Sequence, residues 1–220
     1  MAAPMTDRLY YTDAYRTSFS AEIVDRSEDG LRVYLNATAF YPTSGGQLHD
    51  LGTLGGVAVV DVVDEDDRIA HVLASPLGAA GSVHGEIDRA RRLDHMQQHT
   101  GQHLLSAVFE DLFGYSTVSV HFGPDYSTLD LSAESVTRAQ LLAAEARANA
   151  VVGENRPVAV TFEDAATAAG LRKASDRQGM LRVVSIDAVD RSACGGTHVR
   201  STAEIGPVLV RSTEKIRKAT

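Results

Sequence analysis

The chain has 220 residues, a formal net charge of −8 and a single cysteine, Cys194. Its length allows a buried core, and one cysteine excludes an intrachain disulfide, so we expect a protein of a reducing, cytoplasmic compartment. The acidic charge argues against holding nucleic acid through phosphate contacts alone, and the lack of long apolar stretches argues against a signal peptide or a membrane span.

Residues 19–88 consist of short β-branched runs separated by turn signals, without sustained helical periodicity. Hairpins are predicted at Gly30, between strands over 20–25 and 31–35, and at Gly55-Gly56, between 53–54 and 57–63. A further strand is predicted over 68–73. Short strands at this spacing favour a closed or partly closed barrel. We therefore predict a β-barrel-like N-terminal domain over residues 1–88.

Within this half, the glycine-rich run over 38–50 reads TAFYPTSGGQLHD and is not explained by barrel strands alone. Gly45 and Gly46 allow a tight turn and a close approach of the backbone to a ligand, and Gln47 offers both a donor and an acceptor. On spacing alone, a hairpin loop whose polar residues face water is the more common interpretation.

Residues 89–220 mix helices and strands. A helix over 94–114 is predicted from Asp94 as its N-cap, Gln97 as the capping-box partner of Asp94 and Gly114 as its C-terminal stop. The later elements are strands over 117–122 and 128–132 joined across 123–125, a helix over 136–152, strands over 157–162, 181–186 and 205–210, and a short helix over 163–169. This order predicts an α+β domain over 89–220, with helices on a mainly antiparallel sheet.

The helix over 94–114 carries His95, His99 and His103 at intervals of four, so all three face one side. Histidines at helical spacing are often ordinary surface or hydrogen-bonded residues. Cys194 and His198, in the loop sequence CGGTH, supply a further thiolate and imidazole, and zinc prefers four nitrogen and sulfur ligands in a tetrahedron.

We predict one zinc ion per chain, held by His99, His103, Cys194 and His198. His95 stays outside this ligand set and is assigned, with Gln102 and Thr197, to the support of the ligands or to the pocket. Gly101, inside the helix, suggests that another group approaches the backbone closely. The remaining histidines have no partners in the sequence pattern and are given ordinary roles: His49, His71, His84 and His121.

Three motifs, HTGQHLLS, CGGTHV and TAFYPTSGGQLHDLG, resemble the editing domain of alanyl-tRNA synthetase and the free-standing alanyl-tRNA editing proteins of the AlaX group. The resemblance extends over residues 37–207, and the glycine-rich motif favours the medium-length, free-standing kind. It implies a small barrel-like domain followed by an α+β editing domain related to that of threonyl-tRNA synthetase.

The resemblance also implies hydrolysis of the ester that joins a wrong amino acid, chiefly serine and secondarily glycine, to the terminal adenosine of tRNA(Ala). It implies zinc on residues matching His99, His103, Cys194 and His198. Thr38 matches a threonine that senses the serine hydroxyl, and Gln47 matches the glutamine of the GGQ turn. Ser192 and Ala193 occupy positions where related proteins often carry an acidic residue, which leaves the support of the metal ligands open.

The sequence leaves several alternatives open. Zinc could activate water or orient the substrate, because four protein ligands are typical of a closed site and HTGQH lacks the glutamate of HExxH metalloproteases. The alternatives to an aminoacyl-tRNA deacylase are a non-catalytic tRNA-binding module with structural zinc and a zinc hydrolase of small amino-acid esters or amides. Candidate phosphate contacts are Arg89, Arg91, Arg92, Lys215, Arg217 and Lys218.

Overall fold

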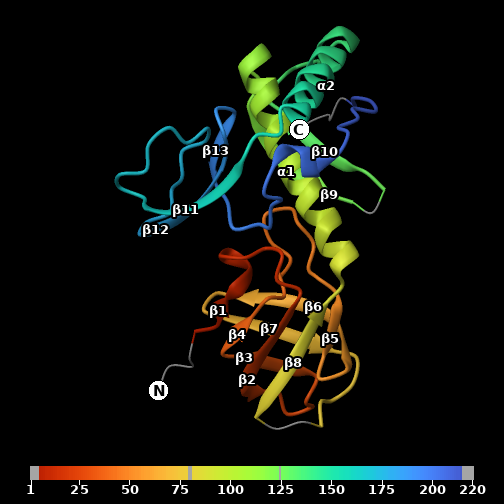
Figure 1. The fold of residues 1–220 in the computed structure, drawn as a ribbon, viewed down its shortest axis with the longest axis vertical. Coiled ribbons are helices and arrows are strands. Elements are labelled where there is room, and N and C mark those ends of the chain that lie inside the picture. Colours follow the sequence, from red (N-terminus) through yellow and green to blue (C-terminus); the bar gives the residue numbers. More distant parts are fainter. Residues whose placement is uncertain (1–4, 79–80, 124, 215–220) are drawn as a thin grey trace, which may run out of the picture. The chain divides into compact units, whose positions relative to one another are not determined.

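The computed structural model describes residues 5–78, 81–123 and 125–214 (Figure 1). Packing divides the chain into two compact units, Met1–Met96 with Gly195–His198, and Gln97–Cys194 with Val199–Thr220. The sequence places the division at residue 88 instead, and that domain boundary stays a prediction. Among the described residues, no helix is both long and apolar enough to cross a membrane.

The first unit contains a closed barrel of antiparallel strands in the order β2-β3-β7-β6-β5-β8. The strands are β2 (Ser18–Arg26), β3 (Arg32–Leu35), β5 (Gly52–Leu54), β6 (Val57–Glu65), β7 (Arg68–Leu73) and β8 (Ser82–Ile87). The predicted β2–β3 and β5–β6 hairpins are confirmed. Gly55 and Gly56 have φ angles of 57° and 81°, which glycine adopts without strain. Whether the barrel is a separate domain stays a prediction.

Two short strands lie outside the barrel sheet in the same unit. β1 (Asp7–Arg8) pairs in parallel with β4 (Ala37–Thr38), and the 3-10 helix η1 (Leu9–Tyr11) follows β1. The barrel core is formed by buried side chains of alternate strand positions, among them Val33, Leu54 and Ile69. Phe40, in the glycine-rich run, packs into this core with no exposed surface, so the run is anchored at its start.

The long helix α1 (Arg89–Phe113) begins five residues before the predicted Asp94. The side chain of Asp88 accepts hydrogen bonds from the backbone N–H groups of Ala90 and Arg91, at 2.9 and 3.1 Å, and so caps the helix. The sequence offers two aspartates with capping chemistry, and the earlier one is used. The helix ends as predicted, because Gly114 adopts a φ of 70° beyond its last turn.

The second unit is α+β, as predicted. β11 (Val158–Asp164), β12 (Met180–Ile186) and β13 (Asp190–Ala193) form an antiparallel sheet, and β9 (Thr117–Phe122) pairs with β10 (Ser127–Leu131) as a hairpin. Residue 124, in the predicted turn of this hairpin, lies outside the described residues. The helix α2 (Arg138–Gly153) begins after Thr137, which forms a capping box with Gln140.

Two predicted elements are wrong. Over 163–169, β11 continues to Asp164, whose carboxylate accepts a hydrogen bond from the Ala166 N–H and closes a turn in place of a helix. The predicted strand over 205–210 is absent. The 3-10 helix η2 (Thr202–Ile205) ends there, and the N–H groups of Val208 and Val210 bind side chains of α2, so they are not free to form a ladder.

Candidate metal centre

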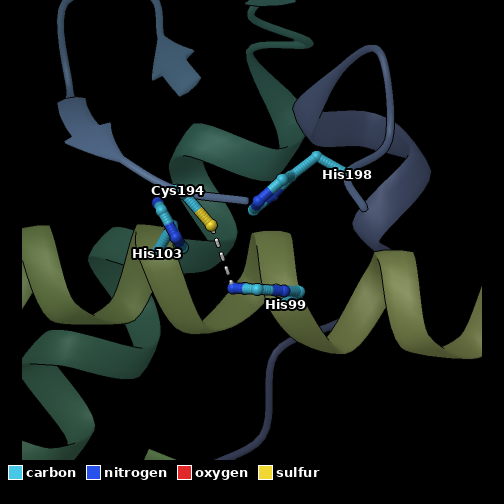
Figure 2. Close-up of side chains that lie close together, drawn as sticks. All are labelled: His99, His103, Cys194 and His198. Atoms are coloured by element: carbon cyan, nitrogen blue, oxygen red, sulfur yellow. Dashed lines mark hydrogen bonds between the residues drawn. The ribbon is translucent and has the colours of Figure 1, made fainter. Parts of the chain in front are cut away.

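The helix α1 places His99 and His103 one turn apart on the same face, with their ring centroids 5.2 Å apart (Figure 2). Both are buried, with 3% and 5% of their surface exposed. Gly101, between them, is small for a packing reason: a Cβ at this position would lie 3.3 Å from the side chain of Ile205 in η2. The group that approaches the helix backbone closely at Gly101, as the sequence suggests, is therefore the side chain of Ile205.

Cys194 follows β13 and is held in place by the neighbouring strand. Its N–H donates to the Arg182 carbonyl at 3.0 Å, and the Arg182 guanidinium donates to the Cys194 carbonyl at 2.7 Å. Farther along the loop, the Val199 N–H donates to the hydroxyl of Thr100 on α1 at 3.1 Å. Backbone contacts on both sides of the CGGTH sequence thus fix where its side chains point.

The ligand atoms of His99, His103, Cys194 and His198 all lie within 4.8 Å of one another, and Figure 2 shows the four side chains converging. The Cys194 sulfur is 3.4 Å from Nε2 of His99. A tetrahedral zinc with bonds of about 2.0 Å to nitrogen and 2.3 Å to sulfur separates such a pair by about 3.5 Å. Three imidazoles and one thiolate are also a donor set that zinc prefers. The residues present therefore fit a zinc ion.

Asp190 supports this cluster and was missed in the sequence. Its carboxylate accepts a hydrogen bond from Nδ1 of His103 at 2.8 Å, and its side chain has no exposed surface. A proton held on Nδ1 leaves Nε2 of His103 with its lone pair toward the cluster. Asp190, four residues before Cys194, thus supplies the acidic side chain that is missing at Ser192 and Ala193. The signal was the alternation of Asp190, Ser192 and Cys194 on one face of an extended segment.

Asp190 is itself held by two further residues. Arg172 donates through Nε to its carboxylate at 2.6 Å, and Ser192 donates through its hydroxyl at 3.0 Å. Burial alone lowers the pKa of His103, but with no metal bound the negative charges of Cys194 and Asp190 raise that pKa to about 9, so a metal ion would have to displace the proton on Nε2 in order to bind there. The pKa of Asp190 moves oppositely: burial is the largest single effect and raises it, but the hydrogen bonds and positive charges of His103 and Arg172 together outweigh burial and lower it.

The glycine-rich run makes a tight turn whose glutamine contacts the CGGTH loop within the first unit. Gly45 and Gly46 have φ angles of 57° and 87°, and Ser44 and Gln47 close the turn with two backbone hydrogen bonds of 3.0 Å. The fully buried Gln47 amide donates to the Thr197 hydroxyl at 2.9 Å and accepts from the Thr197 N–H at 3.2 Å. Gln47 therefore positions the residue next to His198.

Thr38 is fully buried, and its hydroxyl contacts Nε2 of His71 at 2.8 Å and the Phe40 N–H at 3.1 Å. Nδ1 of His71 lies 3.0 Å from the Val33 carbonyl, which can only accept, so the proton of a neutral His71 is on Nδ1. Burial lowers the His71 pKa to about 4 and keeps the ring neutral. The Thr38 hydroxyl therefore donates to His71 and retains only acceptor capacity.

The other predicted site residues are placed differently. His95 is buried, and among the described residues its Nδ1 has no hydrogen-bond partner. Burial lowers the pKa of His95, so this nitrogen belongs to a neutral ring. Gln102 is partly buried and donates to the hydroxyl of Ser106 at 2.7 Å.

Arg92 is the predicted phosphate contact that the structure contradicts. It is 1% exposed and pairs with Asp50, the Ala14 carbonyl and the Ala39 carbonyl, so its donors are used inside the protein. Arg89 is exposed, and Arg91 is partly buried with a bond to the His49 carbonyl. The other three candidates lie outside the described residues: Lys215, Arg217 and Lys218.

Residues 181–220 match the family model of the threonyl and alanyl tRNA synthetase second additional domain. The alanyl-tRNA editing protein Aarsd1-A of Xenopus laevis is 35% identical over 94% of this chain and 55% of its own length. Aarsd1 of Mus musculus is 36% identical over 86% of this chain and 47% of its own length. AlaX-L of Pyrococcus horikoshii is 34% identical over 94% of this chain and 54% of its own length.

The chain thus spans about half the length of these curated relatives. The resemblance predicted from the three motifs is confirmed: the chain is similar to alanyl-tRNA editing proteins over most of its own length, and residues 181–220 match the model of the threonyl and alanyl tRNA synthetase second additional domain.

Proposed function

We propose that the chain hydrolyses mischarged tRNA(Ala) in trans, releasing serine chiefly and glycine secondarily from the terminal adenosine. The observation that carries this proposal is the convergence of His99, His103, Cys194 and His198 in a chain whose relatives are named alanyl-tRNA editing proteins. We propose that its partner is the acceptor end of tRNA(Ala) and that it acts in the cytoplasm.

The four cluster residues would hold one zinc ion, which would supply a fixed positive charge beside the ester carbonyl or the amino group of the substrate. The protein's own part is orientation. Asp190 holds the proton on Nδ1 of His103, so that Nε2, the opposite nitrogen, is the one that would act as a ligand. Arg172 and Ser192 keep the Asp190 carboxylate in position.

Gln47 and Thr38 have separate parts in the proposal. Gln47 fixes the backbone and the hydroxyl of Thr197, and so sets the conformation of the loop that carries His198.

Thr38 is proposed to stabilise a bound serine substrate through a hydrogen bond. Because the proton of the Thr38 hydroxyl is donated to His71, Thr38 could only accept this bond from the serine hydroxyl. Thr38→Val should then lower the preference for serine over alanine, whereas Thr38→Ser should keep it. An equal preference in both variants would remove Thr38 from the specificity pocket.

A second candidate is a tRNA-binding module in which zinc is only structural. Four protein ligands favour it, since structural zinc sites are usually closed in this way and catalytic sites usually keep one position open. The two candidates predict the same metal content but different chemistry.

The test is serine release from Ser-tRNA(Ala) by zinc-loaded protein, with Gly-tRNA(Ala) and Ala-tRNA(Ala) compared under the same conditions. We expect release of serine, slower release of glycine and retention of alanine. Absence of release from correctly folded Ser-tRNA(Ala), with stoichiometric zinc present, would reject the hydrolase and favour the structural module.

A further inference from the structure

The end of the β9–β10 hairpin lies against the cluster through the second unit's own contacts. The ring of Phe122, the last residue of β9, is 5.2 Å from the ring of His99 between centroids. Ser127, which opens β10 and pairs with Phe122, donates through its hydroxyl to the Gln98 side chain at 3.1 Å. Two contacts on α1 therefore fix the hairpin end beside a predicted metal ligand.

This hairpin end presents Tyr126 to solvent. Tyr126 is 62% exposed, and among the described residues no hydrogen bond or ring contact engages its side chain. Its backbone is nevertheless fixed, because its carbonyl accepts a hydrogen bond from the Gly123 N–H at 3.1 Å. A Cβ at Gly123 would lie 2.7 Å from that carbonyl oxygen, so the turn requires glycine there. An aromatic ring is thus held by a backbone hydrogen bond to Gly123, one residue from Ser127, which contacts α1.

The chemistry of the proposed substrate explains an exposed aromatic ring at this place. The ester is attached to the ribose of the terminal nucleotide, and the base of that nucleotide is attached to the same ribose. A base must therefore lie close to any centre that hydrolyses the ester. Because the net charge is −8, phosphate contacts alone are not expected to supply the affinity, whereas stacking of a base on an aromatic ring does not depend on charge.

We propose that Tyr126 is the stacking platform for the base of the 3′-terminal nucleotide of the RNA substrate. This inference rests on the proposed function and adds a binding residue to it. The contact recognises the face of the base, so it accepts any purine and contributes to binding of the RNA end without selecting the amino acid.

A fluorescence experiment tests the contact without relying on hydrolysis. The chain contains no tryptophan, so Tyr126→Trp introduces a single tryptophan at the proposed platform, which can be excited selectively above the absorption of the tyrosines. The probe is a hairpin RNA with a single-stranded 3′ end that terminates in adenosine. We expect this RNA to quench the fluorescence of the introduced tryptophan saturably, and the same RNA with an abasic terminal nucleotide to quench it much more weakly. Equal quenching by the two RNAs, or none with either, would overturn the inference.

Val118→Trp is the matched control. Val118 lies on the same hairpin, near its other end, and is similarly exposed at 64%. Its variant also carries a single tryptophan, and we expect no base-dependent quenching from it. Quenching of equal size at both positions would mean that the RNA contacts the hairpin without selective stacking, which contradicts the proposal.

Kinetics separate this inference from the proposed function. With zinc content unchanged, Tyr126→Ala should raise KM for Ser-tRNA(Ala) by about tenfold or more and leave kcat nearly unchanged, and Tyr126→Phe should resemble the wild type. Wild-type deacylation with an unchanged KM in Tyr126→Ala would reject the stacking contact alone. Absence of wild-type deacylation would reject the proposed function, and base-dependent quenching in the Tyr126→Trp variant would still report the contact.

Discussion

At the scale of single residues, Asp190 links the cluster to the rest of its unit. Its buried carboxylate binds His103 on one side and Arg172 on the other, at 2.8 and 2.6 Å. Asp190→Asn replaces a carboxylate oxygen with an N–H group that must face one of these two donors. We expect zinc affinity to fall by about 10- to 100-fold, as for other partners of metal-binding histidines. Competition with a chelator of known affinity measures the change.

Asp187→Asn is the control for this experiment, because Asp187 is exposed and lies only three residues away. It should bind zinc like the wild type. An Asp190→Asn protein with unchanged zinc affinity would show that the orientation of His103 does not depend on the carboxylate.

His71 gives the stability of the first unit a defined dependence on pH. Burial lowers its pKa from 6.5 to about 4 in the folded protein. Below pH 6.5 the His71 side chain is therefore protonated in the unfolded chain but not in the folded chain. As the pH falls from 6.5 toward 4, this difference lowers the free energy of unfolding by about 3 kcal/mol.

The matched variants are His71→Gln and His84→Gln. A glutamine at 71 can donate to the Val33 carbonyl and accept from Thr38, but it does not titrate. Its free energy of unfolding should lose about 3 kcal/mol less between pH 6.5 and 4 than that of the wild type, by denaturant titration at each pH. His84, whose side chain is 53% exposed, should give a variant that follows the wild type. Identical pH profiles for all three proteins would contradict a neutral, buried His71.

At the scale of elements, Gln47 couples the glycine-rich turn to the CGGTH loop. Gln47→Ala leaves the buried Thr197 N–H and hydroxyl without this partner, which should destabilise the protein by about 1–3 kcal/mol. Thr197→Val removes only the hydroxyl. A double-mutant cycle of unfolding free energies should give a coupling of about 1 kcal/mol between the two positions. Additive effects would show that the turn and the loop are energetically independent.

The sequence predicts elements well where the determinants are local. The hairpin at Gly55-Gly56 and the end of α1 at Gly114 depend on residues next to the turn, and both are confirmed. The predicted strand over 205–210 does not form because its N–H groups donate hydrogen bonds to side chains that are distant in sequence. Val208 donates to Asn149 and Val210 donates to Glu145, both on α2. The predicted start of α1 is wrong because Asp88 and Asp94 have the same capping chemistry, and the residue spacing does not distinguish between them.

The candidate site divides in the same way. His99 and His103 are marked by helical spacing, and Cys194 is the single cysteine, so a four-residue cluster follows from local patterns and donor chemistry. Asp190 is 87 residues from His103; its alternation with Cys194 places it on the ligand face of the strand, but its hydrogen bond to His103 depends on the tertiary fold. The sequence pattern places Arg92 in a basic run and suggests a surface charge. In the structure Arg92 is buried, and its charge is paired with Asp50.

At the scale of the whole molecule, the acidic charge and the proposed RNA substrate fit together only if affinity comes from the acceptor end. In this protein 29 acidic side chains outnumber 21 basic ones, and Arg92 is buried, so no overall excess of cations attracts phosphates. We expect its RNA affinity to depend only weakly on salt. The slope of log Kd against log salt, measured with an acceptor-stem hairpin RNA, should correspond to about one to three phosphate contacts. A slope equivalent to about six or more contacts would point to an extended basic surface.

We propose that His99, His103, Cys194 and His198 form one zinc site and that hydrolysis of the aminoacyl ester depends on it. The most direct measurement is a titration of metal-free protein with zinc, with serine release from Ser-tRNA(Ala) followed at each step. The rate should rise in proportion to zinc, level off at one equivalent per chain, and stay near background in His103→Ala. Full activity in metal-free protein, or a plateau well away from one equivalent, would contradict the claim.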